Sequence, residues 1–303
     1  MTGKTIRTFL AAALSISGTM IGGTTIAGTT IAGCGGSESR AETPSPSETD
    51  RSADEMGLAA EESETTGEEP EPPPPPVTVV AGERTQIEGP TPTLRIAAPR
   101  ANQVIRTGNV MVRLQVRNWD LESPQGPHVH LIVDNEPYIA IRDVSQPLDV
   151  NALVQEHLGH ELAEGTHVIR MFPSRGHHES VKDPGAFGMV VFHYRTRTEG
   201  FEFDPAAPLL TYSRPKGCNP VGERVLLDFY LTNTELAEDG NRVHWTIDGQ
   251  SGDITQWAPH WIENLQEGEH DISLELRGPD GNPIPGAFNT TTRTFTVASS
   301  CPS

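Results

Sequence analysis

Basic residues are scarce in this chain of 303 residues, which has 22 Lys and Arg against 41 Asp and Glu and a formal net charge of −19 at pH 7. Nucleic acids and anionic membrane faces are themselves negatively charged, so neither is expected to be the main partner of so acidic a protein. The simplest interpretation of the charge is that it keeps the protein soluble.

Sequence signatures of familiar active sites are also missing. The chain has no G-x-S-x-G motif, no H-E-x-x-H motif and no phosphate-binding glycine loop. Pairs of acidic residues such as Glu263 and Glu267 are most simply solvated surface groups. We therefore expect a protein that is not an enzyme.

Acidic residues are absent from the first 37 positions, where Lys4 and Arg7 precede an apolar run. This pattern is typical of a secretory signal. The four residues IAGC that end at Cys34 resemble the lipobox of bacterial lipoproteins, in which the cysteine is acylated and the preceding signal is removed. The resemblance implies a signal peptide at 1–33 and a lipid on Cys34. Conventional cleavage at an earlier small residue, which leaves Cys34 free, is the alternative.

A lipid on Cys34 would attach the protein to a membrane without spanning it, because several acyl chains together give stable anchoring. The next residue is Gly35, not the Asp associated with inner-membrane retention in enteric bacteria. We therefore predict an exported protein, attached through its lipid to the outer membrane on the periplasmic or surface face.

The segment after Cys34 has few residues that could build a core. Positions 35–77 hold twelve Asp or Glu and two Arg, no aromatic residue, and the run EEPEPPPPP. Such a composition buries too little apolar surface to offset the entropy lost on ordering. Residues 34–89 are therefore predicted to be a disordered acidic and Pro-rich tether, stiffened by its proline run.

The rest of the chain contains an internal repeat. LAEGTHVIRMF returns as LQEGEHDISLEL, and DPGAFGMVVFHY returns as IPGAFNTTTRTF. The offset between matching residues falls steadily, from 115 for Asn118 and Asn233 to 101 for Gly185 and Gly286. A tandem duplication with a few length changes would give this trend. We place the two domains at 90–198 and 205–299.

Each repeat consists of short β-branched and aromatic runs separated by Gly, Pro, Asn and Asp, which is typical of a β-sandwich. In RVHWTID the alternation of residues places three apolar side chains on one face, and HVHLIVD in the first repeat gives the matching set. The predicted core residues are Val129, Leu131, Val133, Val243, Trp245 and Ile247. The pattern resembles tandem immunoglobulin-like or fibronectin-type modules, an all-β fold that hosts many functions.

The first repeat is the longer one, with thirty residues from Asp134 to Glu164 against nineteen from Asp248 to Glu267. The excess contains LDVNALVQEHLGH, whose apolar residues recur at helical spacing between a possible N-cap, Asp149, and a glycine at 159. We predict one short helix there, with an extra edge strand as the alternative.

Only three cysteines occur, so Cys218 and Cys301 remain after Cys34 is set aside. In an exported protein such a remaining pair is most simply a disulfide. The bond would connect the start of the second repeat to the C-terminal tail and close that domain.

Histidines give the sharpest indication of a site. His128 and His130 are two residues apart, so they share the face of a strand opposite to its core residues. In an immunoglobulin-like sheet the neighbouring strand is THVIRMF, and the loop after it has His177 and His178. Imidazole clusters suit Zn²⁺ or Cu²⁺, to which Glu179 or Asp183 could add an oxygen ligand. These four histidines are the candidate metal ligands.

The repeat separates the histidines into two groups. His130 matches His244 and His167 matches His270, so each pair is expected to serve the common fold. His128 aligns with an arginine, and the His177 and His178 pair aligns with no histidine. The three residues without counterparts are therefore the stronger candidates for a specific role, whereas His130 would only assist.

The first repeat also resembles a family of exported bacterial domains of unsettled activity, which have a His-rich strand of the type HHHLLID and a Pro-Gly-Glu-His-like turn. His128, His130, Asp134, Gly165 and His167 match this pattern over about 75 residues, with departures at 129 and 164. The resemblance supports an exported sandwich and adds slight weight to a metal site.

These features predict a lipid-anchored lipoprotein of the cell envelope with a non-catalytic binding or structural role, a protein or glycan partner, and no cofactor. The alternative is a periplasmic or cell-surface protein that binds Cu or Zn through the histidines of its first domain.

Overall fold

The computed structural model describes residues 73–302. The predicted signal peptide, the predicted lipid attachment site Cys34 and the predicted tether as far as residue 72 lie outside the described residues. The described residues lie within one compact unit.

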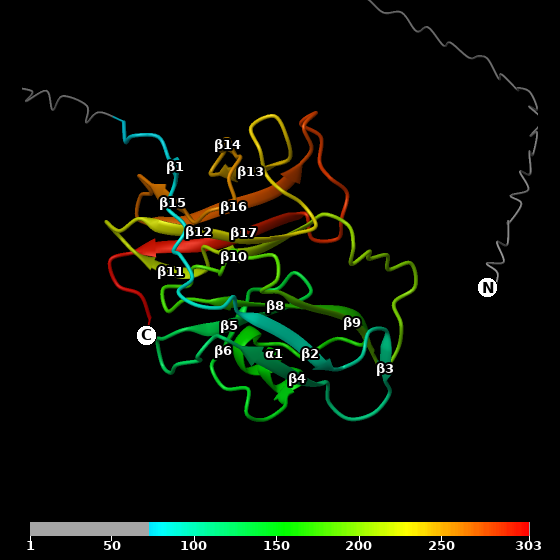
Figure 1. Ribbon diagram of the computed structural model, residues 1–303. Helices are drawn as coiled ribbons and strands as arrows, with labels where there is room; N and C mark the ends of the chain where they lie inside the picture. Colours follow the sequence, from blue (N-terminus) through cyan, green and yellow to red (C-terminus); the bar gives the residue numbers. More distant parts are fainter. Residues whose placement is uncertain (1–72, 303) are drawn as a thin grey trace, which may run out of the picture. The chain divides into compact units, whose positions relative to one another are not determined.

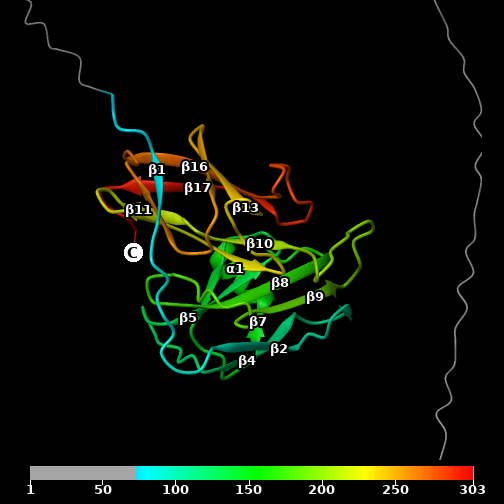
Figure 2. The ribbon, with the colours of Figure 1, turned by 45° about the horizontal axis from the view of Figure 1, so that its top comes forward.

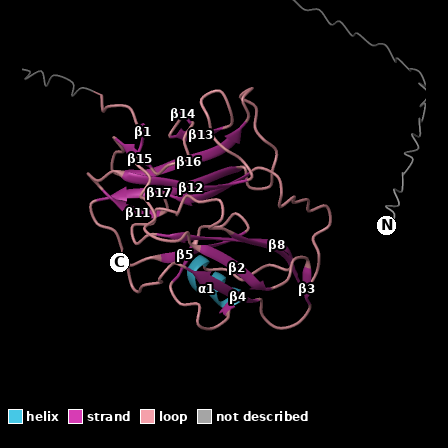
Figure 3. Ribbon diagram, in the orientation of Figure 1, coloured by secondary structure: helices cyan, strands magenta, loops and turns pink. Residues whose placement is uncertain are grey.

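The described chain is nearly all β, with seventeen strands and one short helix (Figures 1 and 3). Four sheets form two sandwiches, one for each repeat. This confirms the predicted all-β class and its immunoglobulin-like sandwiches.

The first sandwich has a three-stranded sheet in the order β2-β4-β7 and a five-stranded sheet in the order β3-β9-β8-β5-β6. Its strands are β2 (Thr93–Ala98), β3 (Gln103–Ile105), β4 (Met111–Arg117), β5 (His128–Val133), β6 (Ile139–Ile141), β7 (Leu148–Asp149), β8 (Gly165–Ser174) and β9 (Gly188–Tyr194).

The second sandwich has a four-stranded sheet in the order β1-β15-β12-β10 and a five-stranded sheet in the order β11-β17-β16-β13-β14. Its strands are β1 (Thr78–Ala81), β10 (Leu209–Arg214), β11 (Gly217–Pro220), β12 (Val225–Thr232), β13 (Arg242–Ile247), β14 (Gln250–Ile254), β15 (His260–Glu263), β16 (Gly268–Arg277) and β17 (Thr290–Ala298).

The two sandwiches share one topology. In each, a short strand near the start pairs in parallel with the last strand, β3 with β9 and β11 with β17, and every other named pairing is antiparallel. Backbone conformation matches as well, since φ is 57° at both Asn118 and Asn233, and 148° and 144° at Gly165 and Gly268. The left-handed region favours asparagine and glycine, which explains why these residue types recur.

Each sandwich has its own core, and the core residues predicted from the alternation are confirmed. All six are buried in the two main apolar clusters: Val129, Leu131, Val133, Val243, Trp245 and Ile247. The predicted disulfide is also confirmed, because Cys218 and Cys301 are bonded and connect the start of the second sandwich to the C-terminal tail.

The predicted helix is α1 (Val150–Leu158), so the alternative of an edge strand is wrong. The Asp149 side chain accepts a hydrogen bond from the Ala152 amide at 3.1 Å, which makes it the N-cap. Gly159 ends the helix with a φ of 78°. The buried Val150 and Val154 attach the helix to the first core.

The end of the predicted tether is folded, which corrects its boundary at residue 89. β1 pairs antiparallel with β15 in the second sandwich, and the Gly82 amide donates to the Pro259 carbonyl at 2.7 Å. The chain then crosses to the first sandwich, where β2 begins (Figure 2). We call residues 77–90 the strap. Its VTVVA run has β-branched residues that suit pairing with an exposed strand edge.

The two sandwiches contact each other through the outer face of the β5 and β8 sheet, which lies against β10 and β12 (Figures 1 and 2). An aromatic cluster there joins Ile132, Tyr138 and Phe172 of the first sandwich to Tyr230 of the second. The fully buried Arg170 donates to the Leu210 carbonyl and to the Thr211 hydroxyl.

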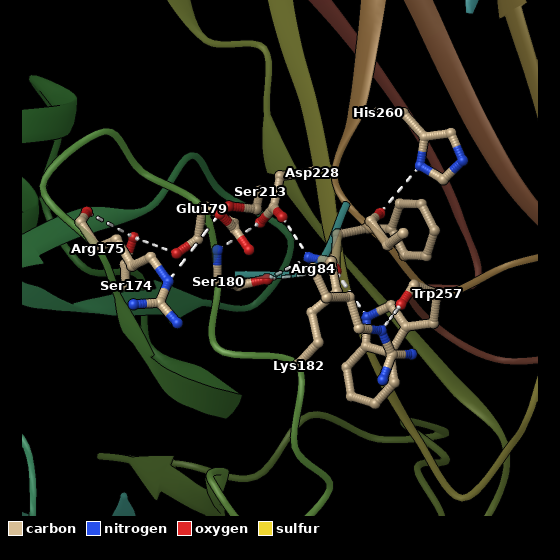
Figure 4. A network of polar contacts seen from close by, with 12 residues as sticks. Arg84, Ser174, Arg175, Glu179, Ser180, Lys182, Ser213, Asp228, Trp257 and His260 are labelled. Carbon is tan, nitrogen blue, oxygen red and sulfur yellow. Dashed lines mark hydrogen bonds and ion pairs between the residues drawn. The ribbon is translucent and has the colours of Figure 1, made fainter. Parts of the chain in front are cut away.

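A buried ion pair crosses the same interface. Lys182 of the first sandwich and Asp228 of the second form a pair whose side chains are 2% and 0% exposed. Figure 4 shows Lys182 and Ser180 both pointing toward Asp228, and the Ser180 amide donates to its carboxylate. Both faces of the first sandwich's five-stranded sheet are therefore covered near β5.

Candidate functional site

Two histidines of β5 lie in the interface between the sandwiches. The strand alternates, so His128 and His130 point away from the core of the first sandwich and toward the second. Both side chains have no exposed surface. A third histidine, His178, comes from the loop between β8 and β9 and has a φ of 71°, an uncommon conformation for a residue with a side chain. The loop holds this strained residue against the pair on β5.

The three imidazoles converge on one point. His130 Nε2 is 3.0 Å from His128 Nε2, and His178 Nδ1 is 3.1 Å from the same atom. One ring nitrogen from each residue lies within 4.8 Å of the other two. Among residues 73–302, this is the one group of three or more His, Cys, Asp or Glu side chains with that spacing.

The outer nitrogens of two rings have protein partners. His128 Nδ1 lies 2.9 Å from the Gly126 carbonyl, which can only accept, so Nδ1 bears the proton. In the neutral ring Nε2 then has a lone pair that points into the cluster. His130 Nδ1 lies 3.1 Å from the Ser213 hydroxyl of β10. Metal-binding histidines are usually oriented in this way, through a hydrogen bond from the far ring nitrogen.

Tyr138 closes one side of the cluster. Its ring stacks on that of His130, with centroids 3.6 Å apart and planes 9° apart, and its hydroxyl is 3.1 Å from His178 Nδ1. On its far side the Lys216 ammonium lies 4.2 Å from the ring centroid and donates to the Tyr138 carbonyl at 2.7 Å. The Arg214 guanidinium lies 5.4 Å from the same centroid. Burial raises the pKa of Tyr138 to about 12, so its hydroxyl keeps its proton.

The surroundings keep the three imidazoles neutral. Burial lowers the pKa of His128, and the charges of Arg142 and Arg214 lower it further. Burial, with the neighbouring imidazoles, holds the pKa of His130 well below its usual range. Burial, followed by Arg214, lowers the pKa of His178 to about 3. Around neutral pH the ring lone pairs are therefore not occupied by protons.

Two of the three separations between the nitrogens fit a metal ion better than an anion. Ligands about 2.0 to 2.1 Å from a tetrahedral ion lie about 3.3 Å apart. Two donors that share one anionic oxygen at about 2.9 Å lie about 4.7 Å apart at a tetrahedral angle. The 3.0 and 3.1 Å separations match the first case to within a few tenths of an ångström.

The remaining predicted ligands lie elsewhere. His177 is exposed, and its Nε2 is 3.0 Å from the Glu179 carboxylate, outside the cluster. Glu179 also accepts from the Thr85 hydroxyl of the strap at 2.7 Å. The Asp183 carboxylate accepts from the Gly185 amide at 2.8 Å. The structure thus joins His128, His130 and His178, and it leaves out His177 and both proposed oxygen ligands.

The expectation that His130 and His244 serve the same structural purpose is wrong. His130 is fully buried among histidines, whereas His244 pairs at 2.7 Å with Asp253 and its side chain is 20% exposed. The difference arises because the second sandwich covers β5, while the corresponding strand β13 packs beside β14 and β16 and its outer face stays partly exposed.

The other repeated pair does serve the common fold. His167 Nδ1 is 2.7 Å from the Asp134 carboxylate, and its Nε2 donates to the Ala163 carbonyl at 2.8 Å. His270 makes the same two contacts in the second sandwich, with the Asp248 carboxylate at 2.6 Å and the Gln266 carbonyl at 2.8 Å. Both rings connect a strand end to the turn before it.

The sequence pattern did not identify three residues around the cluster, Tyr138, Ser213 and Lys216. Ser213 and Lys216 belong to the second repeat, so no spacing within the first repeat could have identified them. Tyr138 follows β5 by five residues, and its place in the run EPYIAI indicated only a strand.

The chain matches no family model and no curated protein. Solved structures match it at low similarity. The fibronectin(III)-like modules of Clostridium thermocellum CbhA have 12% identity and a TM-score of 0.24, over 68% of this chain and 94% of theirs. Beta-glucuronidase of Parabacteroides merdae has 11% identity and a TM-score of 0.23, over 69% of this chain and 25% of its own.

A third match is the Bacteroides ovatus protein SGBP-B of a mixed-linkage glucan utilization locus, solved with a heptasaccharide, at 12% identity and a TM-score of 0.18 over 72% of this chain and 71% of its own. Structural similarity at this level supports no conclusion about function, which therefore depends on the geometry of the site itself. The described part of the chain contains no helix that is long and apolar enough to cross a membrane.

Proposed function

We propose that this protein binds a transition-metal ion, of the copper or zinc class, through His128, His130 and His178 at the junction of its two sandwiches. One observation supports this above the others: the inward lone pair of His128 Nε2 faces two further ring nitrogens, at 3.0 and 3.1 Å. The role is binding, not catalysis.

A network of hydrogen bonds alone satisfies these atoms poorly. The single lone pair of His128 Nε2 has room for one well-aligned N–H donor. If His130 Nε2 donates to it and the Tyr138 hydroxyl donates to His178 Nδ1, the acceptor nitrogens of His128 and His178 still lie 3.1 Å apart with no proton between them. A cation shared by the three nitrogens removes this conflict, because each then directs a lone pair at the same ion.

The burial of the three-histidine site favours retention of a bound ion. His128 and His130 have no exposed surface, and the ring of Tyr138 and the Ser213 hydroxyl cover the cluster. Since Ser213 belongs to the second sandwich while the ligands belong to the first, a bound ion would also favour the docked arrangement of the sandwiches. Metal binding and stability are then linked.

We place this function at the cell envelope, with the folded unit held to the outer membrane through a lipid on Cys34. The proposal is supported by the lipobox-like IAGC and by the acidic, Pro-rich segment that follows. Cys34→Ser is expected to move the protein from the membrane fraction to the soluble fraction of cells. Unchanged partitioning would refute the anchor and leave the metal site untouched.

Calorimetric titration with Cu²⁺ and Zn²⁺ tests the metal site in the mature chain, residues 34–303 with Cys34→Ser. We expect one ion per chain with a Kd below about 10 µM. His130→Ala and His178→Ala should each weaken binding at least about tenfold, because each removes a ligand. The control is His244→Ala, the exposed counterpart of His130 in the second repeat, which should bind as the parent does.

His130 is buried, so its removal could disturb the fold. Thermal melting of each variant without metal identifies that effect, and the half-buried His178 provides a second ligand whose loss perturbs less packing. Binding weaker than about 10 µM in the parent, or equal binding in the parent and both ligand variants, contradicts the proposed function.

A further inference from the structure

We propose that the three-histidine site selects monovalent copper, Cu⁺, over divalent ions such as Zn²⁺. The inference rests on the proposed function, since it concerns which ion those three imidazoles hold. It follows from the charge around the site and from the number of ligands present.

Cationic side chains surround the cluster. The Lys216 ammonium and the Arg214 guanidinium lie 4.2 and 5.4 Å from the centroid of the Tyr138 ring, which itself stacks on His130 at 3.6 Å. These two positive charges therefore oppose any cation that enters.

The ligands themselves contribute no negative charge. The group that can hold an ion consists of three histidines, and it includes no carboxylate or thiolate among the described residues. Asp228, a carboxylate whose charge acts on Tyr138, is already paired with Lys182. An ion in this site keeps its full charge, in contrast to ions bound by Asp, Glu or Cys.

Electrostatic repulsion is proportional to the charge of the ion. A divalent ion therefore meets twice the repulsion that a monovalent ion meets from Lys216 and Arg214 in the same position. Burial strengthens this difference, because the effective dielectric constant between the sandwiches is lower than that of water. The surroundings thus favour Cu⁺ among the ions that imidazole binds well.

Ligand number favours the same ion. Zn²⁺ in proteins is almost always four-coordinate and adds water or another ligand when only three side chains bind it. At this site the face next to His130 is occupied by the ring of Tyr138, and both histidines of β5 have no exposed surface. Cu⁺ is satisfied by three nitrogen ligands, which is the number that the site offers.

Competition with chelators measures the preference in the mature chain. Cu⁺ is titrated against bicinchoninate without oxygen and with ascorbate present, and Zn²⁺ is titrated against a fluorescent chelator. We expect Cu⁺ to bind at least tenfold more tightly than Zn²⁺. The His244→Ala control should leave both affinities unchanged.

Removal of one neighbouring charge tests the cause. Lys216→Gln and Arg214→Gln should each tighten the binding of both ions, and the gain in log K for Zn²⁺ should be about twice that for Cu⁺. Lys216 also donates to the Tyr138 carbonyl, which glutamine can replace only in part, so Arg214→Gln, at the end of β10, gives a second reading.

The possible outcomes separate the two proposals. If neither ion binds, the proposed function itself fails. If Zn²⁺ binds as tightly as Cu⁺ or more tightly, the metal site stands and the preference for Cu⁺ is wrong. If Cu⁺ is preferred but both charge variants shift the two ions equally, the electrostatic cause is overturned.

Discussion

At the scale of single residues, neighbours across the fold determine what a histidine does. His130 and His244 occupy matching positions in the repeat, yet one is buried in a cluster and the other pairs with a surface carboxylate. Strand alternation and the pairing of β5 with β8 were enough to predict that His128, His130 and the following loop meet. The choice of His178 over His177 was not predictable, because it depends on the left-handed backbone of one loop residue.

The alternation also failed to show that the outer face of β5 is covered. One indication was present, since Ile132 is apolar at an outward position between the two histidines and Asp134. Its partner in the aromatic cluster, Tyr230, lies almost a hundred residues later in the chain. The residue pattern of a single strand cannot identify a contact partner so distant in the sequence.

Also at the residue scale, His167 makes stability depend on pH. Burial alone would lower its pKa, but the hydrogen bond and charge of Asp134 and the carbonyl of Ala163 outweigh burial and raise the pKa above the usual value. The folded state then holds its proton more tightly than the unfolded state. This contribution is complete below about pH 6.5 and is lost as pH rises through the raised pKa.

Asp134→Asn removes the charge and keeps an oxygen for the Val168 amide, which donates to Asp134 at 2.8 Å. We expect the difference in unfolding free energy between the parent and this variant to be larger at pH 5.5 than at pH 8.5. The change should be up to about 1 kcal/mol, because Asp134 is partly exposed. Urea unfolding at both pH values measures the difference. A difference in unfolding free energy that grows with pH would show that the predicted direction is wrong.

At the scale of secondary structure elements, local signals predicted α1 well. Its cap, its apolar spacing and its terminal glycine all lie within eleven residues, and each agrees with the structure. The strap was predicted poorly, because its partners are distant. The hydrogen bond from Thr85 to Glu179 joins residues 94 apart, and that from Arg84 to the Trp257 carbonyl joins residues 173 apart (Figure 4).

Gly159→Ala tests the end of α1. An added methyl group would meet nothing within 4 Å, so the cost comes from the backbone alone. With φ at 78°, we expect about 1 kcal/mol of lost stability. Urea unfolding measures it, and Gly200→Ala, which also has positive φ and open space, is a matched loop variant outside any helix. A neutral or stabilising effect at 159 would contradict the assigned end of the helix.

At the scale of the whole molecule, the two sandwiches are joined by groups that neither could bury alone. Asp228 has no exposed surface, and the Lys182 side chain across the interface is 2% exposed. Removing one partner of a buried ion pair leaves the other charge without compensation. The sequence could predict two sandwiches from the repeat, but the pairing of two single residues between them requires the docked fold.

Lys182→Met is therefore expected to destabilise the protein by about 3 to 5 kcal/mol. The double variant Lys182→Met with Asp228→Asn should recover most of this loss, because it removes both charges at nearly the same volume and keeps an oxygen for the Ser180 amide. Denaturant unfolding of the parent and both variants provides the comparison. If Lys182→Met costs less than about 1 kcal/mol, the ion pair is exposed to water and is not buried between the sandwiches.

The central claim is that three imidazoles share one metal ion at this interface. X-ray absorption of the mature chain loaded with one equivalent of copper or zinc tests it most directly, because the spectrum reports the ligands of the ion itself. We predict three imidazole nitrogens at about 2.0 Å, falling to two in His178→Ala. A first shell made mainly of oxygen, or one that His178→Ala leaves unchanged, would contradict the claim.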